Sequence, residues 1–156
     1  RGKDAYYPYF YQERSEQAAY REYFEAVLEN VASFPDFDSC GHLDYVTRYG
    51  PSRDKYYSYD KYRDILDEIL KCLIRKGKGL ELNTGGLNAG MRDFHPCREA
   101  LLRYRSLGGE IITIGSDSHD PGLIAQGFDL AARALKECGF NYYAVYEKRR
   151  PVFVKI

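Results

Sequence analysis

The sequence predicts an α/β fold in which helices and strands alternate around a parallel sheet. Helix-like and strand-like segments alternate about four times along the chain, which is typical of repeated strand–helix units. The chain has 156 residues, of which 44% are hydrophobic, so it is long and apolar enough to bury a core. We therefore expect a single domain over residues 1–156, with a sheet that is either open or closed into a barrel.

The first half of the chain is expected to be mainly helical. Between residues 12 and 33 apolar side chains recur at three- and four-residue steps, the period of one helical face. Pro35 ends this helix, because the residue before a proline avoids the helical conformation. A short strand running into a loop is expected over 37–46, and a loop without periodicity over 47–59. A second helix is expected over 60–75.

Strands and helices alternate in the second half. Residues 110–115 form the clearest strand, because a β-branched run is bounded there by glycines. Pro96 and Pro121 each suit the first turn of a helix, and Gly139 ends one. The expected elements are strands at 80–84, 110–115, 142–146 and 152–156, a loop at 85–90, and helices at about 96–107 and 120–138.

Charge and cysteine content exclude several classes of partner. Lysine and arginine number 23 and aspartate and glutamate number 23, so no net field attracts nucleic acid or an anionic membrane. No stretch of about 18 apolar residues is present that could cross a membrane. The four cysteines are far apart without a CxxC pair, which favours reduced thiols. We predict a soluble, cytoplasmic protein that binds neither nucleic acid nor membrane.

Two polar clusters follow predicted strands, where the reactive groups of strand–helix proteins collect. One is Gly41-His42-Leu43-Asp44, and the other runs from Gly115 to Asp120. Asp117 and His119 share one side of an extended segment because strand side chains alternate. Together with His42 they form the nitrogen and oxygen set that zinc, manganese or iron accepts. The alternative is that Asp117 and Asp120 cap the following helix while His119 bonds to backbone.

Three further polar positions have candidate roles. Glu81 and Asn83 share one face of their strand, and a polar face is costly to bury unless it is paired or contacts a substrate. Arg48 could bind a phosphate with its two-pronged guanidinium group, or be a solvated loop residue. His95 precedes a proline at a helix start and is expected to be a capping or surface residue.

Three motifs occur in a set order along the chain. They are residues 37–44, ending in Gly41-His42-Leu43-Asp44 and followed by Arg48-Tyr49-Gly50; Leu80-Glu81-Leu82-Asn83-Thr84; and Gly115-Ser116-Asp117-Ser118-His119, followed by Gly127-Phe128. In order and spacing, over most of residues 20 to 156, they resemble histidinol-phosphate phosphatases of the polymerase and histidinol phosphatase (PHP) family. Each motif alone is a weak signal, and the combination is the more specific one.

The resemblance implies a distorted (β/α)7 barrel, similar to a TIM barrel, whose site holds up to three divalent metals. It implies that His42, Asp117 and His119 are metal ligands, that Asp117 also helps to hold the attacking water, and that Arg48 contacts the substrate phosphate. Glu81 and Asn83 match the family's Glu-x-Asn strand and are assigned to substrate binding. The implied reaction is metal-dependent hydrolysis of L-histidinol phosphate, a small phosphomonoester, in histidine biosynthesis.

The chain departs from the family pattern at its beginning. The family opens with a His-x-His strand, and no such motif occurs among these residues. We therefore expect the C-terminal part of an incomplete barrel, with little or no activity by itself. We also expect isolated chains to dimerise, because an incomplete barrel leaves strand edges exposed. The alternatives are a PHP phosphoesterase with another substrate, or a non-catalytic binding module with an incomplete metal site.

Overall fold

A computed structural model describes residues 4–156 of the chain. The predicted alternation of helices and strands is confirmed in outline. The helices are α1 (Glu16–Ser33), α2 (Arg63–Arg75), α3 (Gly85–Asn88), α4 (Arg98–Ser106) and α5 (Phe128–Glu137). The strands are β1 (Ser39–Cys40), β2 (Gly79–Asn83), β3 (Ile112–Gly115), β4 (Tyr142–Glu147) and β5 (Arg150–Lys155). Short 3-10 helices cover Pro8–Tyr11, Tyr45–Arg48, Tyr59–Tyr62 and Pro121–Leu123.

The first three strands form a parallel sheet in sequential order, as the alternation predicts. β1 pairs with the beginning of β2 through Ser39 and Gly79, and β2 pairs with β3 from Leu80 to Asn83. Because the three strands run in the same direction, their carboxyl ends meet at one edge of the sheet. The loops that follow His42, Asn83 and Gly115 therefore lie together at that edge.

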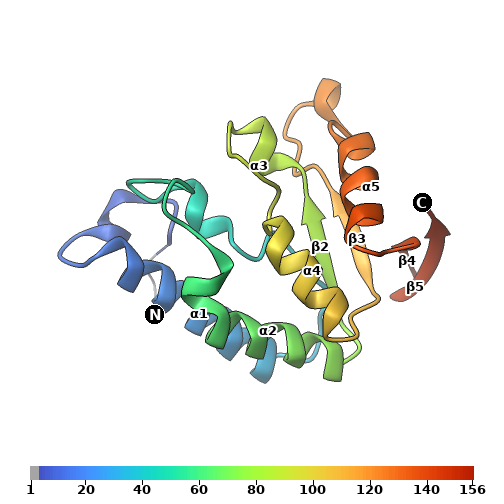
Figure 1. The fold of residues 1–156 in the computed structure, drawn as a ribbon, viewed down its shortest axis with the longest axis horizontal. Coiled ribbons are helices and arrows are strands. Elements are labelled where there is room, and N and C mark those ends of the chain that lie inside the picture. The colour runs from blue at the N-terminus through green and yellow to red at the C-terminus, as the bar shows by residue number, and fades with distance from the viewer. Residues whose placement is uncertain (1–3) are drawn as a thin grey trace.

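The two faces of this sheet differ in chemistry. Leu80, Leu82 and Ile112 are fully buried and belong to the same apolar cluster as residues of α1, α2, α4 and α5. Glu81 and Thr113, which are paired in the register, point to the opposite face. The predicted separation of a polar and an apolar face on β2 is thus confirmed. Figure 1 shows α1, α2 and α4 on one side of the sheet and the strands β4 and β5 on the other.

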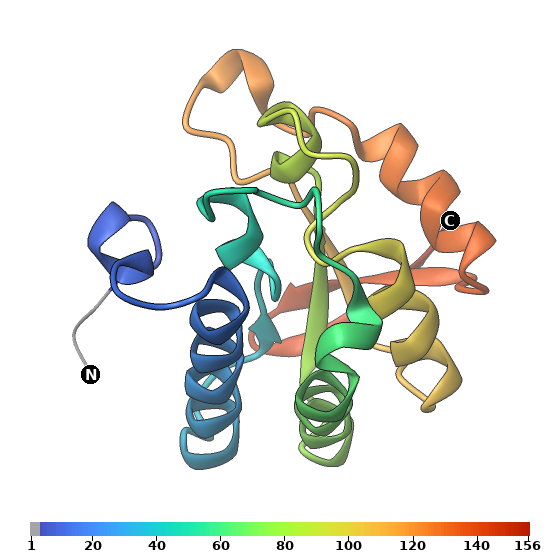
Figure 2. The ribbon, with the colours of Figure 1, turned by 60° about the vertical axis from the view of Figure 1, so that its left-hand side comes forward.

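The helix α1 begins where the sequence supplies a cap. Ser15 is extended, and its hydroxyl accepts a hydrogen bond from the amide of Ala18, which satisfies one of the free donors at the helix start. The helix packs along α2, with Ala19, Tyr20 and Phe24 buried on the shared side. Figure 2 shows these two helices side by side. The predicted end of the helix before Pro35 is confirmed.

The structure corrects the expected helix at 120–138. Asp120 does act as a cap, since its carboxylate accepts a hydrogen bond from Gly122, but only a short 3-10 helix follows. The regular helix α5 begins at Phe128, after Gly127 in the left-handed region at a φ of 79°. The prediction that Pro121 lies in the first turn of a helix is therefore confirmed for the short 3-10 helix, and the prediction that one helix continues from there to residue 138 is wrong. The intervening residues form part of the loop after β3.

The last two strands pair with each other. β4 and β5 form an antiparallel hairpin, a second sheet separate from the parallel one. In Figure 2 this hairpin runs across the parallel strands instead of along them. The Tyr146 hydroxyl donates to the Asp38 carbonyl just before β1, which attaches the hairpin near the amino ends of the strands. The hairpin therefore lies away from the carboxyl edge of the sheet.

Two other predictions concern composition. All four cysteines are free thiols, as expected. No helix within residues 4–156 combines the length and the apolar character that crossing a membrane requires.

Candidate functional site

The predicted site residues come from the carboxyl ends of all three parallel strands. His42 follows β1, Glu81 and Asn83 belong to β2, and Asp117 and His119 follow β3. Arg48 ends the 3-10 helix that comes after His42. The topology thus brings these residues to one edge of the sheet although they are far apart in the sequence.

Glu81 connects the ends of the three strands. One of its carboxylate oxygens, Oε2, accepts hydrogen bonds from the backbone amide of His42 at 2.9 Å and from the side chain of Asn83 at 3.1 Å. The other oxygen faces β3: a Cβ atom on Gly115 would lie only 2.1 Å from Glu81 Oε1. Glycine at position 115 therefore leaves the space in which the Glu81 carboxylate lies.

Asn83 orders the loop that follows β2. The side chain is buried, and its oxygen accepts a hydrogen bond from the Gly85 amide at 2.8 Å, at the start of α3. A Cβ on Gly85 would lie 3.5 Å from the Cβ of Asp117. The loop after β3 therefore lies directly against the loop after β2, and Asp117 belongs to the same cluster of loops as Asn83.

His42 has a buried ring nitrogen without a hydrogen-bond partner within residues 4–156. Its backbone is in the left-handed region, with a φ of 31°, and its ring lies 4.8 Å from the ring of Tyr45 between centroids. The buried nitrogen is Nδ1. Leaving a buried polar atom without a partner is costly, so a buried ring nitrogen without a partner fits a bound cation.

Asp117 and His119 are exposed. The Nδ1 atom of His119 lies 2.9 Å from the Asp117 carbonyl oxygen, and Asp117 has a φ of 49°. The alternative interpretation of this segment is confirmed in part. Asp120 caps the following 3-10 helix and the His119 ring bonds to backbone, whereas no capping hydrogen bond to the Asp117 side chain occurs within residues 4–156. The pKa of the Tyr45 hydroxyl is raised above its usual range. Burial is the main cause, the hydrogen bond to Tyr49 is the next, and the charge of Asp117 adds a smaller contribution.

These residues do not form a closed metal site by themselves. Within residues 4–156 no three side chains of His, Cys, Asp or Glu are arranged so that they could hold an ion together. Imidazole and carboxylate groups of the kind that zinc binds are nevertheless present along one edge. The assignment of His42, Asp117 and His119 as ligands remains a prediction.

Arg48 has an uncommitted guanidinium group. Its Cζ atom lies 5.5 Å from the centroid of the Tyr49 ring, and the side chain is half-buried. Within the part of the chain that the structure describes, it forms no ion pair with a carboxylate. Arginine in this condition retains its donors for an anion.

The structure corrects the expectation for His95. The residue is neither a cap nor on the surface: only 2% of it is exposed. Its Nδ1 atom lies 2.6 Å from the Asp44 carboxylate, which is equally buried. Its backbone forms two hydrogen bonds with Asn83, at 2.7 and 3.0 Å. In the sequence near His95, only the apolar neighbour Phe94 indicates that the residue is buried. No local sequence feature indicates that His95 pairs with Asp44.

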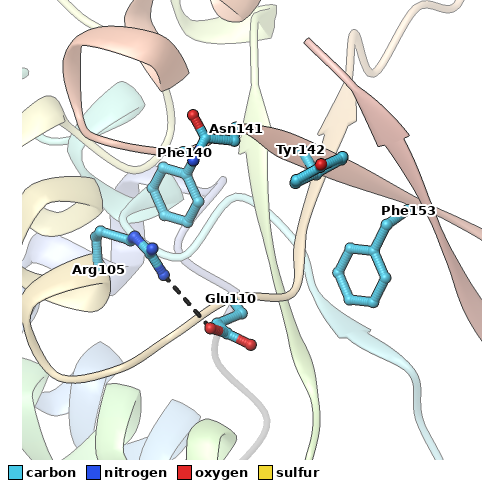
Figure 3. A pocket seen from close by; sticks show the side chains of 6 residues that line it. All are labelled: Arg105, Glu110, Phe140, Asn141, Tyr142 and Phe153. Atoms are coloured by element: carbon cyan, nitrogen blue, oxygen red, sulfur yellow. Dashed lines mark ion pairs between the residues drawn. The ribbon is translucent and has the colours of Figure 1, made fainter.

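Two cavities lie near different ends of the parallel sheet. A cleft of about 380 Å³ has Asp44, Tyr57 and His95 in its wall. Another of about 390 Å³ is lined by Arg105, Glu110, Phe140, Asn141, Tyr142 and Phe153. Figure 3 shows this second cavity beside the hairpin, with Arg105 and Glu110 3.7 Å apart. Because Glu110 precedes β3, this second cavity lies at the opposite end of the sheet and contains no predicted site residue.

Comparison with known proteins identifies similar sequences and a similar structure. The family model described as PHP domain matches residues 2–85, more than half of the chain. The histidinol-phosphatase of Lactococcus lactis subsp. lactis (strain IL1403) is 38% identical over 138 residues, which are 88% of this chain and 51% of that protein. The probable histidinol-phosphatase of Thermotoga maritima is 35% identical over 83% of this chain and 52% of its own. The chain spans about half the length of these relatives.

A solved structure matches as well. It is the crystal structure of histidinol phosphate phosphatase from Lactococcus lactis subsp. lactis, complexed with zinc, L-histidinol and phosphate. Its TM-score is 0.83 at 35% identity, and the match covers 96% of this chain and 57% of that one. The α/β arrangement described above is therefore that of a histidinol phosphatase structure.

Proposed function

The chain belongs to the PHP domain family, and on that premise we propose that it takes part in metal-dependent hydrolysis of L-histidinol phosphate to L-histidinol and phosphate. The observation that carries this proposal is the structural match to an enzyme bound to zinc, L-histidinol and phosphate. The residues His42, Glu81, Asn83 and Asp117 lie at one sheet edge, as such a site needs. The substrate would be a small phosphomonoester.

The proposed architecture is part of a barrel. The chain has three parallel strands with helices on one face and polar side chains on the other, and its match covers 57% of the matched enzyme. We propose that residues 1–156 form one domain, the C-terminal part of a distorted (β/α)7 barrel. A single buried cluster joins residues from Ala5 to Phe140, which supports one domain. Dimerisation of isolated chains stays a prediction, which light scattering tests.

In this proposal His42, Asp117 and His119 each supply a ligand to the divalent cations of the complete enzyme and form no three-ligand site of their own within residues 4–156. The matched structure favours zinc over manganese or iron. Once bound, the cation would make water acidic enough to attack at neutral pH and would offset the charge of the phosphate. Asp117 accepts a hydrogen bond from the attacking water and orients it. Arg48 contributes the donors that hold the phosphate oxygens. The Glu81 carboxylate holds the His42 loop by accepting a hydrogen bond from the His42 backbone amide. The Asn83 side chain donates to the same carboxylate and holds it in place.

The test is phosphate release from L-histidinol phosphate in the presence of zinc. The protein is compared with Arg48→Ala and with Arg63→Ala, an exposed arginine away from the site. We expect Arg48→Ala to raise KM for the substrate at least about tenfold, because a charge-assisted bond is lost, and Arg63→Ala to change nothing. Faster release from an unrelated phosphomonoester would point instead to a PHP phosphoesterase with another substrate.

The absence of a three-ligand cluster within residues 4–156 favours a second candidate, a binding module with an incomplete metal site. This candidate predicts that zinc binds weakly and that no phosphate is released from any phosphomonoester. Zinc titration and the phosphate assay, carried out on the same preparation, separate the two.

A further inference from the structure

A closed circuit of hydrogen bonds joins the loops of the candidate site. The His42 amide donates to Glu81, whose same oxygen accepts from the Asn83 side chain. The Asn83 backbone exchanges two hydrogen bonds with His95. The His95 ring in turn bonds Asp44, two residues after His42. The chain between Asp44 and His42 closes the circuit.

Both carboxylate oxygens of Asp44 have hydrogen-bond partners. One carboxylate oxygen lies 2.6 Å from His95 Nδ1, and the other accepts the Cys97 amide at 2.9 Å. The residue is 2% exposed, so its charge receives no help from solvent. A buried carboxylate that loses one of its donors is destabilised, so the bond from His95 helps to hold the loop that bears Asp44.

His95 lies on the side of the sheet that carries the site. It faces Asn83 in an antiparallel bridge with both backbone hydrogen bonds, and directly opposed residues of such a pair point to the same face. Its second ring nitrogen, Nε2, is buried without a partner within residues 4–156. A Cβ on Gly86 would lie 3.2 Å from this atom, so the ring is also held against the start of α3.

We propose that His95 is a positioning residue: by donating from Nδ1 to Asp44 while its backbone is bonded to Asn83, it holds the His42 loop against β2. His42 then keeps the orientation in which its buried Nδ1 faces the cation site. This inference rests on the proposed metal-dependent function. It assigns no direct contact between His95 and the substrate.

The tests use a matched pair of variants. In His95→Asn the amide nitrogen can replace Nδ1 and keep the bond to Asp44. In His95→Gln the amide reaches toward the Nε2 position and leaves Asp44 without this donor. We expect zinc affinity, measured by calorimetric titration, to fall about 10- to 100-fold in His95→Gln, the usual cost of losing a partner behind a ligand. In His95→Asn it should stay within about threefold of the original value.

Two results would overturn the inference. One is zinc affinity of His95→Gln equal to that of the original protein. The other is a loss of kcat in His95→Asn with zinc affinity intact and kcat retained in His95→Gln, because that pattern would make Nε2 the active atom. If the original protein itself binds no zinc, the proposed function fails, which is a different outcome.

A measurement on the unmodified protein covers the case in which His95→Gln does not fold. Long-range proton–nitrogen NMR spectra report which nitrogen of each histidine carries the proton. We expect His95 to be protonated at Nδ1 and unchanged by zinc, while the His42 nitrogens shift. A zinc-induced shift of His95 Nε2 would make His95 a ligand and refute the positioning role.

Discussion

Two pairs of aspartate and histidine lie at the same sheet edge and differ in almost every physical respect. Asp44 and His95 are 51 positions apart (95 − 44), fully buried and 2.6 Å from each other. Asp117 and His119 are two positions apart and exposed, and within residues 4–156 the His119 ring hydrogen-bonds to a backbone carbonyl and to no side chain. Burial forces the first pair to satisfy its own hydrogen bonds, whereas exposure leaves the side chains of the second pair available to a ligand.

This difference teaches that residue type alone does not assign a role. The same two side chains stabilise a loop in one place and are proposed to bind a cation in the other. Substitutions in the buried pair should therefore change stability first, and substitutions in the exposed pair should change activity first.

The largest expected effect is on the exposed pair. Asp117→Asn should lower kcat about 100- to 1,000-fold, because the cation loses a charged ligand and the attacking water faces a neutral acceptor in place of a carboxylate. The free energy of unfolding without metal should change by less than about 0.5 kcal/mol, since the carboxylate is exposed. Steady-state phosphate release and urea unfolding measure the two quantities.

Asp129→Asn, an exposed carboxylate in the first turn of α5, is the matched control and should leave kcat within about twofold. Unchanged kcat in Asp117→Asn would remove Asp117 from the catalytic assignment.

The buried pair should respond in the opposite way. Asp44→Ala should lower the free energy of unfolding by about 3 kcal/mol, because it leaves the His95 ring and the Cys97 amide without their acceptor. Urea unfolding in the absence of zinc measures this. Asp60→Ala, which removes an exposed ion pair with Arg63, should cost about 0.5 kcal/mol or less. Equal losses in the two variants would contradict the difference in burial.

A smaller effect is expected when the space around the Glu81 carboxylate is reduced. This carboxylate accepts the His42 amide on one side and faces Gly115 on the other. Gly115→Ala would place a methyl group 2.1 Å from Glu81 Oε1, so the carboxylate that accepts the His42 amide must shift. We expect about tenfold weaker zinc binding, measured by calorimetric titration. Gly122→Ala, where the nearest atom would be 3.4 Å away, is the control. Full zinc affinity in Gly115→Ala would show that Glu81 does not support the site.

The smallest effect concerns a carboxylate remote from the site. Asp67 bonds Arg103 at 2.9 Å and the Tyr59 hydroxyl at 2.7 Å, and the guanidinium group is the main cause that lowers its pKa from 3.8 to about 2. Because the folded-state pKa is depressed, this stabilisation is complete above about pH 4 and is lost as the pH falls toward 2.

Urea midpoints between pH 5 and pH 2 should therefore decline less in Asp67→Asn than in the original protein, a difference measured at about pH 2 to 4. Parallel declines would mean that a paired carboxylate outside the site does not contribute to acid stability. The stability loss predicted for Asp44→Ala would then be explained by the burial of Asp44 and not by the pairing of carboxylates in general.

Much of the fold could be predicted because its signals are local. The three-and-four spacing in α1, the β-branched run of β3 and the period-two alternation of Glu81 and Asn83 each lie within a few consecutive residues. The same holds for the candidate site, since polar residues directly after parallel strands must meet at one edge. His42 and Asp117 are predicted in this way, and Glu81 and Asn83 are predicted from their alternation within β2.

The boundaries of α5 and the arrangement of β4 and β5 were less predictable. Asp120-Pro121 carries a valid helix-start signal, yet the chain needs the following residues for the loop beside Thr84, whose hydroxyl donates to the Gln126 carbonyl at 2.6 Å. The hairpin was visible as two strands, but nothing in their residues specified that they pair with each other across the sheet.

The sequence by itself determined the alternation of helices and strands, the polar face of β2 and the residue types at the carboxyl edge. Only the tertiary structure decided that His95 is buried against Asp44, that Glu81 bonds the His42 amide, and that Gly115 makes room for it. The physical reason is range: periodicity and capping are recorded in neighbouring residues, whereas burial and pairing depend on segments brought together from 34 to 51 positions apart (115 − 81 and 95 − 44).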